Sequence, residues 1–184
     1  MQTIQITEAG VELTFAVEFH CDDDFGAPWE NSDGNGVVSG WERRSKLPGE
    51  LILSESRGSK RFFDFAETCK IALRDGWDAQ PYNDGSETPR QQAAKAARAN
   101  YEYLRGWCQG SWSYVGVEVT LLDDEGEKTD VSDSLWGVET LNDYHQTQAK
   151  EIAEELAAGM GVRWGWTEKV AKVAEWIKEG SANA

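Results

Sequence analysis

Two stretches of the chain alternate hydrophobic and polar residues, and this alternation predicts the central strands of a sheet. Between Val11 and His20 every second residue is hydrophobic, and residues 113–122 repeat this period of two. Such alternation is typical of strands that bury one face and expose the other, as in antiparallel sheets. It also places His20 on the polar face of its strand. Weaker patterns predict further strands at residues 1–6, 50–55 and 128–139.

Hydrophobic residues at helical spacing, together with capping residues, predict the helices. Asp64 followed three positions later by Glu67 resembles a capping box, and Gly76 is a typical residue just beyond a helix C-terminus. Thr88 and Gln91 flank a proline at the first helical position, which marks a second start. The predicted helices cover residues 64–75, 88–106, 143–158 and about 167–179.

The order of these elements predicts an α+β fold. We expect a single domain over residues 1–184, with an antiparallel sheet of about four to five strands and about four helices packed on it. Residues 21–48 read as a long loop and residues 180–184 as a frayed tail. The glycines of Gly159-Met160-Gly161 are expected to end the third helix.

Aromatic residues gather at the ends of the predicted elements, where packing requires them. We expect Trp29 and Trp41 to anchor the long loop against the core. Trp107, Cys108 and Trp112 are expected to lock the second helix onto the sheet.

The 184 residues carry a formal net charge of −15, and this charge is unevenly spread. Residues 1–42 contain no Lys or Arg, and residues 118–155 contain only Lys128 and Lys150 as basic residues. A field of this sign repels nucleic acid and attracts basic surfaces, so no direct DNA binding is expected. The alternative is that the acidity only keeps the protein soluble.

The sequence contains no motif of a known catalytic or targeting class. It has no apolar run of transmembrane length, and the residues after Met1 do not resemble a signal peptide, so a cytoplasmic location is expected. The three cysteines form no Cys-x-x-Cys pair, and there is neither a phosphate-binding glycine loop nor a nucleophile elbow. We therefore predict a protein that is not an enzyme, with no catalytic residue and no cofactor.

One local pattern fits the spacing of a calcium-binding loop. Asn31, Asp33, Asn35 and Glu42 stand at ligand positions of such a twelve-residue loop, with Gly36 at its turn. The first position is Asn rather than Asp and no helix is expected on either side, so a polar Asn/Gly-rich turn is the favoured reading. Calcium or magnesium is the ion that the alternative reading would place here.

A second pattern offers metal chemistry at the start of the same loop. Asp22-Asp23-Asp24 beside His20 has the residue types of a divalent-cation site for phosphoryl chemistry. A metal-dependent enzyme that uses residues 22–42 is therefore the third functional hypothesis. An exposed acidic turn at the end of a strand is the simpler reading.

The leading functional hypothesis rests on the acidic surface. Carboxylates at phosphate-like spacing can occupy a cationic nucleic-acid groove on another protein, a form of DNA mimicry that salt weakens. The candidate partner-binding residues are Asp22, Asp23, Asp24, Glu30, Asp33, Asp123, Asp124, Glu125, Glu127, Asp130 and Asp133. If the strands that carry them pair in one sheet, these acids could line one edge together.

The second functional hypothesis is a pocket that binds or sequesters a nucleotide. Tryptophan rings can stack on a base, and basic side chains can contact its phosphates. The candidate phosphate contacts are Arg43, Arg44, Lys46, Arg57, Lys60 and Arg61. The alternative is that the tryptophans fill the core and the basic residues pair with the excess acids.

Several phrases of residues 50–145 resemble a group of uncharacterised accessory proteins encoded by bacteriophages and prophages. These phrases are Lys60-Arg-Phe-Phe-Asp-Phe65, Arg74-Asp-Gly-Trp77, Tyr103-Leu-Arg-Gly-Trp-Cys108, Val119-Thr-Leu-Leu-Asp-Asp-Glu-Gly126 and Ser134-Leu-Trp-Gly-Val-Glu139. The resemblance implies a phage origin and expression in the cytoplasm of a bacterial host, and it implies no catalytic residue. By analogy with small acidic phage proteins, we expect a non-enzymatic inhibitor of a host defence complex, of the anti-CRISPR or anti-restriction type. The partner would carry a basic nucleic-acid-binding surface, and the sequence leaves the oligomeric state open.

Overall fold

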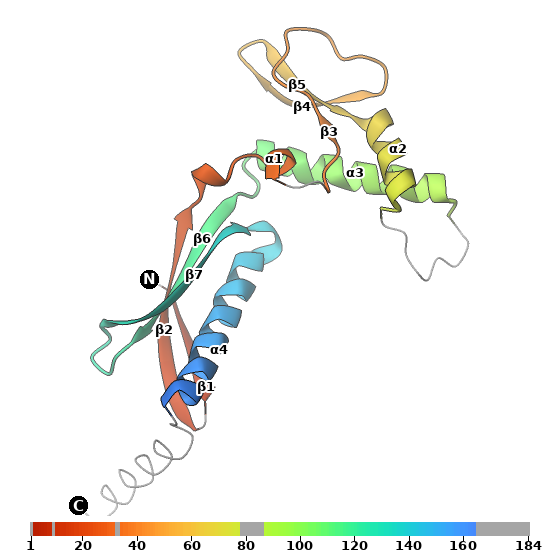
Figure 1. Ribbon diagram of the computed structural model, residues 1–184. Helices are drawn as coiled ribbons and strands as arrows, with labels where there is room; N and C mark the ends of the chain where they lie inside the picture. Colours follow the sequence, from red (N-terminus) through yellow and green to blue (C-terminus); the bar gives the residue numbers. More distant parts are fainter. Residues whose placement is uncertain (1, 9, 32–33, 78–86, 165–184) are drawn as a thin grey trace, which may run out of the picture. The chain divides into compact units, whose positions relative to one another are not determined.

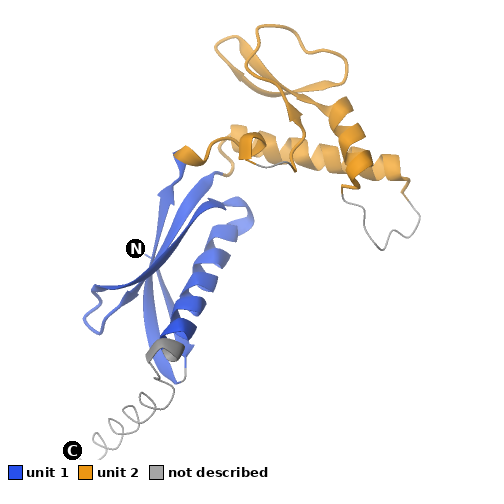
Figure 2. Ribbon diagram, in the orientation of Figure 1, with its two compact units in different colours: residues 1–23, 113–184 blue, residues 24–112 orange. Residues whose placement is uncertain are grey.

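The structure is a computed structural model that describes residues 2–8, 10–31, 34–77 and 87–164 (Figure 1). The chain forms two compact units (Figure 2). Unit 1 consists of residues 1–23 and 113–184, and unit 2 consists of residues 24–112. The predicted α+β class with antiparallel sheet is confirmed, and each unit has its own sheet. A single domain over residues 1–184 stays a prediction.

Unit 1 is built on a four-stranded antiparallel sheet in the order β1-β2-β6-β7. Its strands are β1 (Gln2–Glu8), β2 (Val11–Cys21), β6 (Tyr114–Leu122) and β7 (Lys128–Glu139). The two most regular strands pair with each other: β2 lies directly beside β6, with Val17 opposite Val119 and Glu18 opposite Glu118. The sheet therefore shows one apolar and one polar face at its centre.

Helix α4 (Tyr144–Trp164) lies along the apolar face of this sheet, after the short 3-10 turn η2 (Leu141–Asp143) (Figure 1). The core between helix and sheet is formed by Phe15, Val17, Val117 and Val119 with Ala149, Ile152, Ala153 and Ala157. The small helical residues let the helix approach the strands closely, and burial of the apolar surface stabilises the unit.

The prediction that Gly159 and Gly161 end this helix is wrong, because α4 continues to Trp164. A glycine inside a helix costs about 1 kcal/mol relative to alanine, which tertiary packing can offset. Met160 lies between the two glycines and belongs to the core of unit 1. The helix predicted at residues 167–179 and the tail 180–184 lie outside the described residues.

Unit 2 combines a small sheet in the order β3-β5-β4 with helices. Its elements are α1 (Pro28–Asn31), β3 (Val37–Val38), β4 (Glu50–Ser56), β5 (Ser59–Asp64), α2 (Phe65–Asp75) and α3 (Pro89–Cys108), and the 3-10 turn η1 (Asp23–Phe25) stands at its start. Its core consists of Leu53, Phe63, Tyr101 and Leu104. The segment predicted as a loop, residues 21–48, thus contains short elements of its own.

Strand β5 was not predicted from the sequence, because the two-residue turn before it lacks the usual turn residues. Arg57 and Gly58 join β4 to β5, and both have positive φ, of 49° and 79°. Such turns match the right-handed twist of a hairpin but normally carry Asn-Gly or Asp-Gly. Arg57 therefore hides the turn signal.

The predicted helix caps are confirmed. The side chain of Asp64 accepts the backbone N–H of Glu67, and Gly76 ends α2 in the left-handed conformation. Thr88 and Gln91 form a reciprocal capping box at the start of α3. Among the described residues, no helix combines the length and apolar character needed to cross a membrane.

The Trp-rich corner is structural, as predicted, but the contacts of its tryptophans lie on α3 and α1. The indole of Trp112 donates to the carbonyl of Tyr103 at 2.9 Å and stacks on its ring. Trp107 meets Trp29 edge to face, with ring centres 5.3 Å apart. Trp29 is half-buried against the core of unit 2, whereas Trp41 is 49% exposed and does not anchor the loop as predicted.

Candidate functional site

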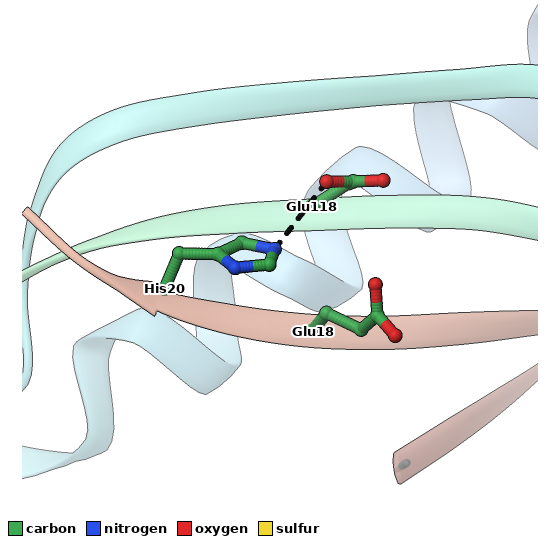
Figure 3. A group of neighbouring side chains, drawn as sticks. All are labelled: Glu18, His20 and Glu118. Atoms are coloured by element: carbon green, nitrogen blue, oxygen red, sulfur yellow. Dashed lines mark ion pairs between the residues drawn. The ribbon is translucent and has the colours of Figure 1, made fainter.

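The polar face of the sheet in unit 1 carries a compact group of interacting side chains on β2, β6 and β7. Glu18 and His20 are alternate residues of β2, so they point to the same side, and Glu118 stands opposite Glu18 on β6. His20 Nε2 lies 3.3 Å from Glu118 Oε2 (Figure 3). One ligand atom from each of these residues lies within 4.8 Å of the other two, and this is the one such group among the residues that the structure describes.

Trp136 on β7 packs against one member of this group, His20. His20 pairs with Gly116 in the sheet, and the pairing of β6 with β7 is interrupted next to Gly116 by a register shift. The shift brings the ring of Trp136 over Gly116, where it also stacks on His20 with ring centres 6.1 Å apart. Because Trp136 is 53% exposed, its outer side faces solvent.

Asp22, one of the predicted partner-binding acids, stabilises the irregular pairing of β7. Asp22 Oδ2 accepts the backbone N–H of Gly137 at 2.9 Å, and Gly137 has a positive φ of 72°. A glycine at positive φ is typical of a bulge. Asp22 is half-buried. Because its hydrogen bond fixes the backbone of Gly137, it also helps to position the neighbouring Trp136.

Lys128 supplies a cation to the same face. Its Nζ lies 2.5 Å from Glu18 Oε2. This hydrogen bond lowers the pKa of Glu18 below its ordinary value, and the same bond raises the pKa of Lys128. Two carboxylates directly opposite each other repel, and Lys128 offsets that repulsion on the Glu18 side.

The predicted partner-binding acids fall into separate groups. Asp22 and Asp23 lie at the end of β2, whereas residues 123–127 form the turn at the opposite end of the sheet, where the β1–β2 hairpin also turns. Since a strand rises about 3.3 Å per residue, the two ends of β6 lie roughly 25 Å apart. The acids of unit 1 therefore do not line one short edge, and Asp24 and Glu30 belong to unit 2.

Within unit 1, the acids of one hairpin do come together. We call Asp123, Asp124, Glu125, Glu127, Asp130 and Asp133 the acidic hairpin; all of them are exposed, and they follow one another through the β6–β7 turn and along β7. Asp123 has a structural role as well, because its Oδ1 accepts the backbone N–H groups of Glu125 and Glu127. Strand β7 is an edge of the sheet.

The remaining candidate acids have local partners or lie outside the described part of the chain. Asp23 Oδ1 accepts the thiol of Cys21, which raises the pKa of that thiol. Glu30 Oε2 accepts the backbone N–H of Ala27 at the start of α1. Asp24 is exposed, and Asp33 is not among the described residues.

The described residues of the calcium-like loop are engaged in protein contacts. Asn31 donates to the carbonyl of Phe25. Asn35 donates to the carbonyl of Pro28, and its side-chain oxygen accepts from the amide of Asn100. Glu42 forms an ion pair with Arg44. Asn35 and Glu42 would have to leave these partners to bind calcium, so nothing in their geometry favours a calcium site.

Four basic residues of the nucleotide hypothesis, Arg43, Arg44, Lys60 and Arg61, have partners within unit 2. Arg44 forms ion pairs with Glu42 and Glu50. The guanidinium carbon of Arg61 lies 4.7 Å from the ring centre of Trp29 and 5.0 Å from that of Trp41. Arg61 therefore occupies the aromatic faces on which a base would stack.

The metal-site hypothesis grouped His20 with Asp22, Asp23 and Asp24. In the structure, His20 lies instead with Glu18 and Glu118. The signal was present: His20 and Glu18 share a strand face, and pairing of the two most regular strands brings Glu118 to that face. Trp136 gave no comparable signal, because its position depends on the register shift in β7. The buried surroundings of Cys69 and Cys108 raise the pKa of both thiols, as expected for structural cysteines.

Comparison of this chain with protein-family models, with curated proteins and with solved structures finds no match.

Proposed function

We propose that this protein is a non-enzymatic, acidic binding protein that occupies a basic, nucleic-acid-binding surface of another protein. The observation that carries this proposal is the separation of charge between the two units. Unit 2 holds twelve Lys and Arg against thirteen Asp and Glu, whereas unit 1 holds six against twenty. Unit 1 therefore bears nearly all of the net charge of −15.

The two basic side chains that the structure describes in unit 1 do not cancel this charge. Lys128 pairs with Glu18, and Lys150 pairs with Glu154 on the same helix. The surface of the acidic hairpin is therefore strongly negative, because all six of its acids are exposed. Such a field steers a basic partner toward unit 1 and raises the rate of association.

Strand β7 adds an apolar contact to the acidic surface. Leu135 is 42% exposed and Trp136 is 53% exposed, and both follow directly after the acidic hairpin. Acids alone on an edge strand would protect it from aggregation. An exposed tryptophan beside them favours binding, because tryptophan is enriched among the residues that dominate interface energies.

The class of partner that we propose rests on the sequence resemblance and on the charge. A phage origin, action in the cytoplasm of a bacterial host, and inhibition of an anti-CRISPR or anti-restriction target are parts of this proposal. Such a target must bind DNA or RNA through a basic groove, which the acidic hairpin would contact in place of phosphates.

The experiment is a pull-down from nuclease-treated bacterial lysate with the purified protein, followed by elution with double-stranded DNA. The proposal expects a protein partner that DNA releases and that high salt weakens. Recovery of a nucleotide with no protein partner would overturn it and favour the nucleotide-binding alternative. A partner that DNA fails to release would also contradict it.

A further inference from the structure

The group Glu18, His20 and Glu118 has the ligand types of a transition-metal site. Two carboxylates and one imidazole come from neighbouring strands and rise on the same side of the sheet (Figure 3). Imidazole nitrogen and carboxylate oxygen are both ligands for Zn²⁺, whereas Mg²⁺ and Ca²⁺ prefer oxygen alone. Three ligand atoms within 4.8 Å of one another can converge on one ion through small rotations of exposed side chains.

The state of His20 Nε2 is a second, independent observation. This nitrogen is shielded from solvent and makes no hydrogen bond of acceptable geometry with the described residues, although Glu118 Oε2 lies 3.3 Å away. The ion-pair contact with Glu118 thus lacks the geometry of a hydrogen bond, which leaves the hydrogen-bonding capacity of this nitrogen unused. A metal ion bound to both atoms would satisfy it.

The surroundings fix the imidazole in this position. Trp136 stacks on the ring with an interplanar angle of 22°, and the contact of Trp136 with Gly116 brings the indole close to the sheet. Asp22 holds the neighbouring backbone through Gly137. Ligands oriented by such outer contacts bind metal more tightly, because less ordering is required on binding.

We propose that Glu18, His20 and Glu118 form a binding site for Zn²⁺, with Lys128 as an internal competitor. Lys128 binds Glu18 Oε2 and leaves the second oxygen of that carboxylate available. The ion would neutralise two opposed carboxylates and keep a fourth position for water or for a group of a bound partner. The site stands on these residues alone and does not depend on the identity of a partner protein.

The test is calorimetric titration of the purified chain with Zn²⁺ in a Cys21→Ser background. This background removes the exposed thiol next to His20 in the chain, because a thiolate is itself a zinc ligand and would complicate the titration. We expect one zinc ion per chain, and His20→Gln or Glu118→Gln should weaken binding by at least about tenfold. Lys128→Met should tighten binding, because it releases Glu18. A merely structural role of the three residues would not produce this opposite effect.

Matched controls use the other histidine and a carboxylate on α4. His145→Gln and the exposed Glu155→Gln should leave zinc affinity unchanged. Circular dichroism of each variant establishes that it is folded, and a variant that fails to fold is replaced by the alternative ligand substitution. Absence of zinc binding, equal binding by His20→Gln, or no gain from Lys128→Met would each overturn the proposal. Since no partner is present in the titration, failure here leaves the proposed function standing.

Discussion

Trp136 lies so close to Gly116 that a side chain at position 116 would clash with its ring in the observed position. A Cβ at position 116 would lie 2.6 Å from the indole, well inside van der Waals contact. The absence of a side chain on Gly116 therefore allows Trp136 to reach His20 across β6. This contact joins the candidate zinc ligands to the exposed edge strand.

Substitution of Gly116 should displace the indole. We expect Gly116→Ala to reduce the free energy of unfolding by about 1 kcal/mol, at the low end for overpacking, because the half-exposed ring can move. The indole N–H resonance of Trp136, assigned with a Trp136→Phe variant, should shift. Gly40→Ala is the control, since a Cβ there meets nothing within 4 Å. An unchanged Trp136 resonance in Gly116→Ala would contradict the contact.

Asp22 should act on stability through its hydrogen bond rather than through its charge. Asp22→Ala leaves the N–H of Gly137 without its acceptor, and we expect a loss of about 1–3 kcal/mol in the free energy of unfolding. Asp22→Asn keeps an acceptor oxygen and should retain most of the stability. Hydrogen exchange at the Gly137 amide and urea unfolding measure the two effects. Equal losses in both variants would show that the charge matters instead.

The ion pair of Arg44 with Glu50 should make stability depend on pH in acid. Two hydrogen bonds, of 2.6 and 2.7 Å, join the guanidinium to this carboxylate and lower its pKa from 4.5 to about 2. A carboxyl whose pKa is lower in the folded state contributes stability above its unfolded pKa. That contribution falls between pH 4.5 and about 2 as the carboxyl is protonated.

Glu50→Gln tests this dependence. We expect the substitution to lower the free energy of unfolding by about 1.5–3 kcal/mol at neutral pH, as for a hydrogen bond to a charged group. The difference between wild type and Glu50→Gln should shrink as the pH falls through the window and vanish near its lower end. Urea unfolding at a series of pH values measures it. A difference that stays constant with pH would rule out this linkage.

The core of unit 2 should depend on Phe63. Its side chain is fully buried at 0% exposure, so Phe63→Ala should reduce the free energy of unfolding by about 3–5 kcal/mol through the lost burial and the cavity. Leu47→Ala is the control, because Leu47 is 55% exposed, and a loss under about 0.5 kcal/mol is expected. Similar losses in the two variants would place Phe63 outside a cooperative core.

Much of the fold could be predicted where local signals are complete. The period-two pattern located β2 and β6, and the capping residues Asp64 and Thr88 located the starts of α2 and α3. The prediction failed where tertiary packing overrides local preference. Buried Met160 carries α4 past two glycines, and Arg57 occupies a turn position that favours asparagine or aspartate.

The candidate site was less predictable because it depends on pairing register. The face of His20 follows from alternation, but the approach of Glu118 requires β2 and β6 to pair in one particular register. The position of Trp136 requires a register shift that has no sequence signal apart from Gly137. The uneven charge is visible in the sequence, but its assignment to one unit of the fold requires the division of the chain.

Binding of a captured partner tests the central claim most directly. The acidic-hairpin variant Asp124→Asn/Glu125→Gln removes two exposed charges from unit 1, and Glu55→Gln/Glu102→Gln removes two from the nearly neutral unit 2. The dissociation constant of each is measured at about 0.05 M and 0.5 M salt, where screening differs strongly. We expect the acidic-hairpin variant to bind about tenfold more weakly at low salt, with a smaller salt dependence, and the unit 2 variant to bind as the wild type does. Equal affinity of the two variants, or binding that salt leaves unchanged, would contradict the account.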